Sequence, residues 1–224
     1  MNTAGMLPLI ATDHKLTGEV ICRTCMLNCL TSNYSDFWEN VYADTFSEFR
    51  WAKSDYRLKN EAFKHLSKHW IHETPARDAY SRRQLMLELD VLISMVLGMT
   101  LDQLLSAYRI QFPTLQQHER DTYYDAEGKI VYAKNNALSG VGFSRSEFEN
   151  AGAVQPTERG SAQWDGIMKN APAGYVFART ITDDTQPGGP VERTIEYVAP
   201  FDRCDREQDY ETAWRFFEEK YKER

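Results

Sequence analysis

The sequence lacks an excess of positive charge. It carries 26 Lys and Arg residues against 33 Asp and Glu residues, which gives a net charge of −7 over 224 residues. A protein that binds DNA by itself usually draws much of its affinity from cations that neutralise phosphates. The chain therefore either binds no nucleic acid or contributes a local patch to a site whose charge lies elsewhere.

The sequence also lacks a long hydrophobic run and a secretion signal. The strongly apolar stretch at residues 91–99 is interrupted by Ser94 and Gly98. It is much shorter than the roughly 20 residues that cross a bilayer as a helix. No basic region precedes the short apolar run in the first ten residues. We expect a soluble, cytoplasmic protein with no membrane contact.

Cysteine is scarce, and its placement argues against a disulfide framework. Cys22, Cys25 and Cys29 are close together in the sequence, and Cys204 is remote. With Cys204 as a fourth ligand they could hold zinc or an iron–sulfur cluster, but zinc sites usually use two close pairs of ligands. The spacing of the first three places them on one helical face among apolar residues, so we interpret them as reduced thiols in a core.

The other candidate metal ligands form an incomplete pattern. His65 and His69 are four residues apart, as in the zinc-binding H-E-x-x-H helix, but Leu66 and Ser67 occupy the interior positions and the glutamate is missing. His72 is the one further histidine nearby. The pattern is typical of a solvated helix face, and we predict no metal site.

No motif predicts a catalytic centre or a cofactor site in this chain. Gly140 and Gly142 form a Gly-x-Gly, but the residues before them do not resemble the strand that such a nucleotide-binding turn follows. The sequence contains no Gly-x-Ser-x-Gly, no P-loop and no Asn-Pro-Pro-aromatic motif of the kind that grips a target adenine. We therefore name no catalytic residues.

Hydrophobic periodicity predicts an α+β fold, with an N-terminal helical bundle, then a mixed region with β-hairpins, and a C-terminal helix. The predicted domains are a helical region over residues 1–121 and an α+β region over residues 122–224. The predicted helices cover residues 16–32, 35–43, 60–68, 76–97, 100–108 and 207–222. A short helical turn is predicted from Pro113, and further short helices are predicted near residues 144–147 and 163–169. The predicted strands form one hairpin over residues 123–132 and a pair over 175–182 and 193–200, joined by a Pro-Gly-Gly-Pro segment.

Two of these helices meet at Gly98 in the manner of a helix-turn-helix. Gly98 is predicted to end the first helix as a C′ glycine, and Thr100 with Gln103 three residues later is predicted to start the second as a capping box. The second helix would offer Thr100, Asp102 and Gln103 at its start, where a recognition helix meets base edges. Between residues 76 and 121 the acidic residues outnumber the basic ones by one. A packed pair of helices is therefore favoured over a reader of the DNA groove.

Two longer blocks carry a resemblance to a known family. They are residues 88–113 (ELDVLISMVLGMTLDQLLSAYRIQFP) and residues 119–132 (ERDTYYDAEGKIVY), accompanied by residues 27–34 and by Thr74-Pro75. Together they resemble the C-terminal region of large bacterial DNA N6-adenine methyltransferase-like proteins from restriction-modification and phage-defence systems of the Eco57I, BREX or DISARM type. The resemblance spans roughly residues 20–142.

The resemblance implies an assembly rather than an activity of these residues. In that family the catalytic and cofactor motifs lie upstream, so S-adenosylmethionine is expected on a larger partner chain and double-stranded DNA would be met through the complex. The tail would contribute DNA recognition or scaffolding, either as a C-terminal part or as a split subunit. The alternative is a stand-alone adaptor or regulator that binds a protein partner without touching DNA. The candidate DNA contacts are the basic residues Arg82, Arg83, Arg109, Lys129, Lys134 and Arg145.

Overall fold

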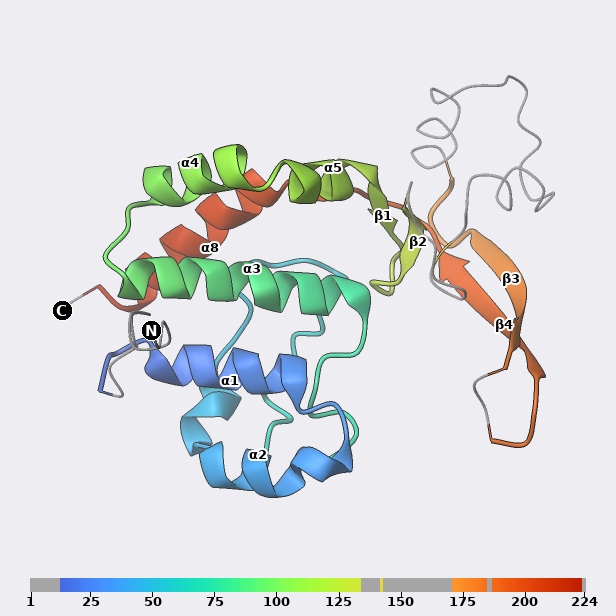
Figure 1. The fold of residues 1–224 in the computed structure, drawn as a ribbon, viewed down its shortest axis with the longest axis horizontal. Helices are drawn as coiled ribbons and strands as arrows, with labels where there is room; N and C mark the ends of the chain where they lie inside the picture. Colours follow the sequence, from blue (N-terminus) through green and yellow to red (C-terminus); the bar gives the residue numbers. More distant parts are fainter. Residues whose placement is uncertain (1–12, 134–141, 143–170, 185–186, 223–224) are drawn as a thin grey trace, which may run out of the picture. The chain divides into compact units, whose positions relative to one another are not determined.

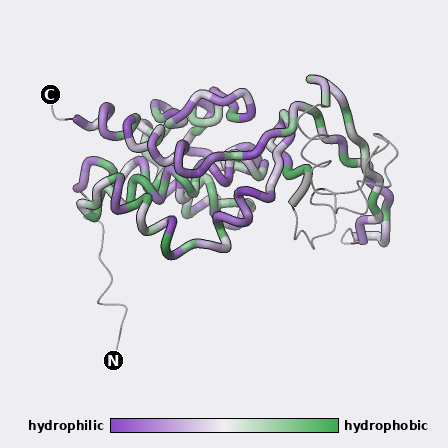
Figure 2. Tube along the Cα trace, turned by 90° about the horizontal axis from the view of Figure 1, so that it is seen from above, coloured by the Kyte–Doolittle hydropathy of each residue, from purple (hydrophilic) through white to green (hydrophobic). Residues whose placement is uncertain are grey.

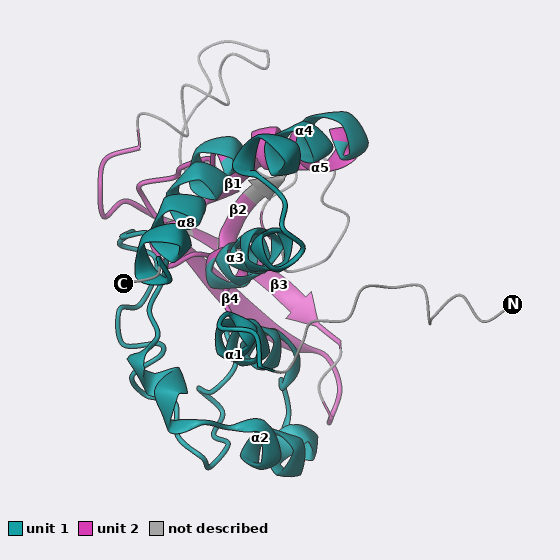
Figure 3. Ribbon diagram, turned by 90° about the vertical axis from the view of Figure 1, so that its left-hand side faces the viewer, with its two compact units in different colours: residues 1–77, 81–112, 206–224 teal, residues 78–80, 113–205 magenta. Residues whose placement is uncertain are grey.

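The computed structural model describes residues 13–133, 142, 171–184 and 187–222 (Figure 1). It confirms the α+β fold class, with helices, two antiparallel hairpins and a C-terminal helix. The chain divides into two compact units, which are coloured separately in Figure 3. Within the described residues, the structure contains no helix that is both long enough and apolar enough to cross a membrane.

Unit 1 is the helical unit and contains residues 1–77, 81–112 and 206–224. In chain order, its helices are α1 (Thr17–Asn28), η2 (Ser32–Tyr34), α2 (Ser35–Val41), η3 (Asp44–Glu48), most of α3 (Ala79–Val96), α4 (Leu101–Gln111) and α8 (Arg206–Lys220). Apolar and hydrophilic residues are interspersed along these helices in Figure 2, as expected for helices with one buried face. The buried side chains of unit 1 include Trp38, Phe63, Leu85, Leu92 and Phe217.

Helix α1 ends at Asn28, four residues before the predicted end, because other groups take its last carbonyls. The Ala76 amide donates to Met26 O at 2.9 Å, and the Arg82 guanidinium donates to Leu27 O at 2.9 Å. The Trp70 indole donates to Cys29 O at 2.8 Å. A helix leaves its final carbonyls without partners in the helix, so these distant donors fix where α1 stops.

The junction between α3 and α4 follows local sequence rules. Gly98 has a φ of +71°, a conformation that glycine adopts without a steric penalty. The Thr100 hydroxyl accepts a hydrogen bond from the Gln103 amide, and the Gln103 side chain accepts one from the Thr100 amide. This is the predicted capping box, and it sets the start of α4.

Residues 60–68 were predicted to form a helix, and that prediction is wrong. The segment forms consecutive turns, closed by hydrogen bonds such as Leu66 N to Phe63 O at 3.0 Å. Phe63 and Leu66 are buried, whereas His65 is exposed. Two buried anchors at i and i+3 need only a turn, and tertiary packing has overridden the local preference for a helix.

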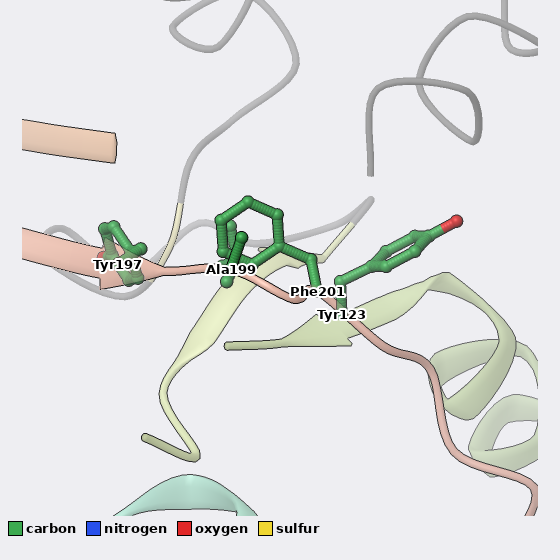
Figure 4. Close-up of a cluster of buried hydrophobic side chains, with 5 residues drawn as sticks. Tyr123, Tyr197, Ala199 and Phe201 are labelled. Carbon is green, nitrogen blue, oxygen red and sulfur yellow. The ribbon is translucent and has the colours of Figure 1, made fainter. Parts of the chain in front are cut away.

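Unit 2 contains residues 78–80 and 113–205. It comprises α5 (Pro113–Asp121), β1 (Thr122–Tyr124), β2 (Ile130–Ala133), β3 (Val176–Asp183) and β4 (Val191–Val198). Strands β1 and β2 pair antiparallel with a register shift at Tyr123/Tyr124, and β3 pairs with β4 over eight residues in each strand. The described core is Tyr123, Val131, Tyr197, Ala199 and Phe201, from β1, β2, β4 and the segment after it (Figure 4).

The division into units differs from the single boundary predicted after residue 121. Helix α5 belongs to unit 2, and the C-terminal helix α8 belongs with the N-terminal helices in unit 1. The apolar stripe of α8 is the physical reason, because Tyr210, Ala213 and Phe217 are buried in unit 1. The predicted helices near 144–147 and 163–169 lie outside the described residues.

Candidate functional site

A group of charged side chains is buried in unit 1, centred on Arg23. The Arg23 guanidinium is fully buried, and so is the Glu88 carboxylate, to which Arg23 Nε donates at 2.7 Å. Arg23 also pairs with Glu19, four residues earlier on α1. Burial alone would lower the pKa of Arg23, but the two carboxylates outweigh burial and raise it. Arg23 therefore stays charged inside the protein.

Each member of this Arg23 cluster has further partners. Glu88 accepts hydrogen bonds from the Ala52 amide and from the Gln84 side chain, both at 2.9 Å. Glu19 accepts from Lys220 at 2.6 Å and from the Tyr221 hydroxyl at 2.9 Å. Buried charges are tolerated when they are paired and hydrogen-bonded in this way. The cluster therefore ties α1, α3 and the end of α8 together.

Aromatic rings enclose the Arg23 guanidinium. Its central carbon lies 5.0 Å from the centroid of the Phe63 ring and 5.1 Å from that of Phe217. Contacts at this range are attractive, and more so when water is excluded. Rings and carboxylates thus surround the cation within the protein interior. We interpret the cluster as a structural anchor rather than as a binding site.

A second charged group holds the first turn of α8. The Asp209 carboxylate accepts from Arg83 at 2.7 Å and from Lys53 at 2.8 Å. The Asp55 carboxylate pairs with Arg57 at 2.7 Å and lies 3.6 Å from Lys53. These side chains are at most 16 % exposed, so the group is shielded from solvent.

The third charged group lies where α4 and α8 meet, and we call it the α4–α8 junction. The Tyr108 and Tyr210 rings pack edge to face at 5.7 Å. The Asp90 carboxylate accepts from the Tyr210 hydroxyl at 2.7 Å and from Arg206 at 3.0 Å. Burial, followed by the charge of Asp90, raises the pKa of the Tyr210 hydroxyl, which therefore remains a hydrogen-bond donor at neutral pH.

An exposed ion pair lies beside this junction. Arg109 on α4 donates from Nε and Nη2 to the two oxygens of Glu207 on α8, at 2.9 and 2.6 Å. The hydrogen bond lowers the pKa of Glu207 and raises that of Arg109. Their side chains are 37 % and 55 % exposed. The Arg109 guanidinium is therefore more exposed to solvent than the guanidinium groups of Arg23, Arg83 and Arg206 in the three charged groups.

The structure places the six predicted DNA contacts in different settings. Arg83 is buried against Asp209, and half-buried Arg82 donates to the carbonyls of Leu27 and Ala76. Lys129 is exposed in unit 2, where it pairs with Glu127 and donates to a backbone carbonyl. With Arg109 bound to Glu207, these four do not form one surface cluster within either unit. Lys134 and Arg145 lie outside the described residues.

The three clustered thiols are buried, as the sequence predicted. Cys22, Cys25 and Cys29 are at most 3 % exposed. Burial raises the pKa of all three thiols, to about 12 for Cys25. Within the part of the chain that the structure describes, no three His, Cys, Asp and Glu side chains are grouped as a metal ion requires. His65 and His69 are both exposed, on a segment of turns and bends.

We expect the thiols of the native protein to react in two classes. At pH 8, Cys204, which is less buried, should react with an aromatic disulfide reagent at least about tenfold faster than the other three, because the thiolate is the nucleophile. Counting released chromophore before and after denaturation measures both classes. Fast labelling of Cys22 or Cys25 in the folded protein would contradict the buried setting.

The sequence alone did not reveal the charged groups. Glu19 and Arg23 are four residues apart, a spacing that usually describes an exposed helix pair. The available signal was that Gln84 and Glu88 interrupt the apolar face of α3, so that polar groups had to meet partners in a core. Arg23 lies 65 residues from Glu88 along the chain, and Lys220 lies 201 residues from Glu19, so these pairings follow from the fold.

Comparison with protein-family models, with curated proteins and with solved structures finds no match to this chain.

Proposed function

We propose that this chain is a non-catalytic scaffolding or DNA-recognition portion of an adenine-specific DNA methyltransferase in a bacterial phage-defence or restriction-modification system. It acts as the C-terminal part of that enzyme or as a split subunit. The larger chain carries the methyltransferase core and binds S-adenosylmethionine. The observation that carries the proposal is the resemblance of residues 88–113 and 119–132, which run from α3 through α4 and from α5 through β2.

The charge pattern supports scaffolding as the main contribution. Three guanidinium groups form ion pairs with carboxylates within unit 1, those of Arg23, Arg83 and Arg206. At the start of α4, Thr100 and Gln103 bond to each other in the capping box. A recognition helix presents such residues to base edges, so α4 is better suited to packing than to reading a groove.

An apolar stripe on α3 supports a protein partner. Met86, Leu89 and Ile93 follow one another at spacings of three and four residues, which places them on one face of the helix, and Leu97 continues this spacing directly after its last residue. Met86 and Leu97 are 48 % and 47 % exposed, and the other two are half-buried. Exposed apolar patches of this kind are typical of protein–protein contacts.

Purification of the tagged chain from its native host tests the proposal. We expect recovery of a chain with an Asn-Pro-Pro-aromatic motif that binds S-adenosylmethionine. Met86→Glu combined with Leu97→Glu should reduce that recovery at least about tenfold, because it places charges in an apolar contact. Ser106→Glu on the exposed side of α4 is the matched control and should have no effect. Failure to recover a methyltransferase or defence protein would rule the proposal out.

The net charge of −7 favours a second candidate, an adaptor that binds a protein partner without contacting DNA. A gel-shift titration with double-stranded DNA at low salt, using the purified complex and the chain alone, separates the two. DNA recognition predicts that Arg109→Ala with Lys129→Ala weakens binding by the complex and lowers its salt dependence. An adaptor predicts the same DNA binding by the variant and native complexes.

A further inference from the structure

Apart from residues 78–80, unit 2 is one continuous insertion in the sequence of unit 1. The chain leaves unit 1 after Phe112, directly beyond α4, and returns at Arg206, the first residue of α8. Both ends of the inserted unit are therefore attached to helices that contact each other in unit 1. Contacts between the last turn of α4 and the first turn of α8 therefore also keep together the two chain segments that lead into and out of unit 2, at residues 112–113 and 205–206.

The buried part of the α4–α8 junction provides a stable base for this attachment. Arg206 lies over the rings of Tyr108 and Tyr210, at 5.9 and 5.3 Å from their centroids. Its guanidinium and the Tyr210 hydroxyl both reach Asp90 on α3. Tyr108, Arg206 and Tyr210 are at most 6 % exposed, whereas the Asp90 side chain that receives them is 45 % exposed, so the two rings and the Arg206 guanidinium are the enclosed part. This part should open only when unit 1 unfolds.

The Arg109–Glu207 pair differs from that base because it is exposed while still joining two elements. Its two parallel hydrogen bonds link residues 98 positions apart in the sequence. The exposed pair Arg215–Glu211 on α8 has a similar solvent setting, but it links two residues of one helix. Exposed ion pairs are weak and sensitive to salt. The Arg109–Glu207 pair thus connects α4 with α8 and, because it is exposed, can be broken by salt at a low cost in free energy.

We propose that the Arg109–Glu207 pair is a clasp that closes the base of the insertion and opens while the rest of unit 1 stays folded. When it is closed, the last turn of α4 and the first turn of α8 are held together at the points where the chain enters and leaves unit 2. When salt or an anion pairs with the guanidinium instead, only the residues of those turns that lie outside the buried contacts of Tyr108, Arg206 and Tyr210 fray, and the two connections gain freedom there. This inference does not depend on DNA binding or on the methyltransferase.

Hydrogen exchange of the full chain tests the clasp. Glu207→Gln keeps the size of the side chain and removes its charge, and it should speed amide exchange in peptides covering residues 108–113 and 205–209 by about three- to fivefold. Exchange in α1 and in the centre of α3 should not change. Glu218→Gln removes an exposed charge from the same helix without opening a bridge and should leave both peptides as in the native chain.

Two further measurements make the result decisive. In 1 M NaCl the native chain should exchange as fast as Glu207→Gln in both peptides, because salt screens the exposed pair. The exchanged pair Arg109→Glu with Glu207→Arg should restore at least part of the protection. Equal exchange in Glu207→Gln and Glu218→Gln would overturn the proposal. Acceleration that extends equally into α1 and α3 would also overturn it, since that is general destabilisation.

Discussion

Replacing Arg23 with methionine should lower the free energy of unfolding of unit 1 by about 3–5 kcal/mol. The substitution keeps an apolar side chain between the Phe63 and Phe217 rings but leaves Glu88 without its cation. A buried carboxylate stripped of its partner costs far more than the net contribution of the intact pair. Urea denaturation followed by tryptophan fluorescence measures the change, because Trp38 and Trp51 are buried in this unit.

A second substitution separates lost charge pairing from lost packing. Adding Glu88→Gln to Arg23→Met removes the stranded charge while keeping an acceptor for the Ala52 amide, so it should recover about 1–2 kcal/mol. Arg215→Met, at an exposed position of α8, should change stability by less than about 0.5 kcal/mol. A cost below about 1 kcal/mol for Arg23→Met would mean that the cluster is not the anchor inferred from its geometry.

The part of the fold that could be predicted is the part with local causes. The turn at Gly98 and the Thr100–Gln103 capping box are specified within a few residues, and both were predicted. The pattern over residues 123–132 likewise predicted the first hairpin, which the structure contains as β1 and β2. Element type and order were therefore accessible from sequence patterns.

The charged groups could not be predicted because their partners come from remote elements. Asp209 meets Arg83 and Lys53 only after α8 has packed into unit 1, 126 and 156 residues away along the chain. The same packing removes Arg83 from the surface, where the sequence had suggested a DNA contact. The sequence shows which residues are basic, but it does not show which of their side chains will be buried in the folded protein.

Replacing Asp125 with alanine should destabilise unit 2 by about 3 kcal/mol or more. Asp125 is fully buried, and its Oδ1 accepts from the amides of Glu127 and Lys129 at 2.9 and 2.8 Å. Its Oδ2 accepts from the Val198 amide of β4 at 3.1 Å. Alanine would leave three amide donors without their acceptor, and each such loss in a buried setting costs about 1–3 kcal/mol.

The position of Asp125 explains why so short a side chain should matter so much. One oxygen shapes the β1–β2 turn, and the other fixes the end of β4 against it, so a single carboxylate joins two hairpins that are each two-stranded. Isolated two-stranded hairpins are marginally stable in water. Loss of the carboxylate should therefore reduce protection of the Lys129 and Val198 amides together, as hydrogen exchange read by NMR would record.

Two variants at the same turn test that coupling. Asp125→Asn keeps one acceptor oxygen and should fall between the native chain and Asp125→Ala. Glu127→Ala removes an exposed carboxylate two residues away, and it should change stability by less than about 0.5 kcal/mol. If Asp125→Ala exposed the Lys129 amide but left the Val198 amide protected, the carboxylate would belong to the turn alone. The link between the hairpins would then come from their other contacts, which include the hydrogen bond from the Ala126 amide to Val198 O at 2.8 Å and the packing of Tyr123, Val131 and Tyr197.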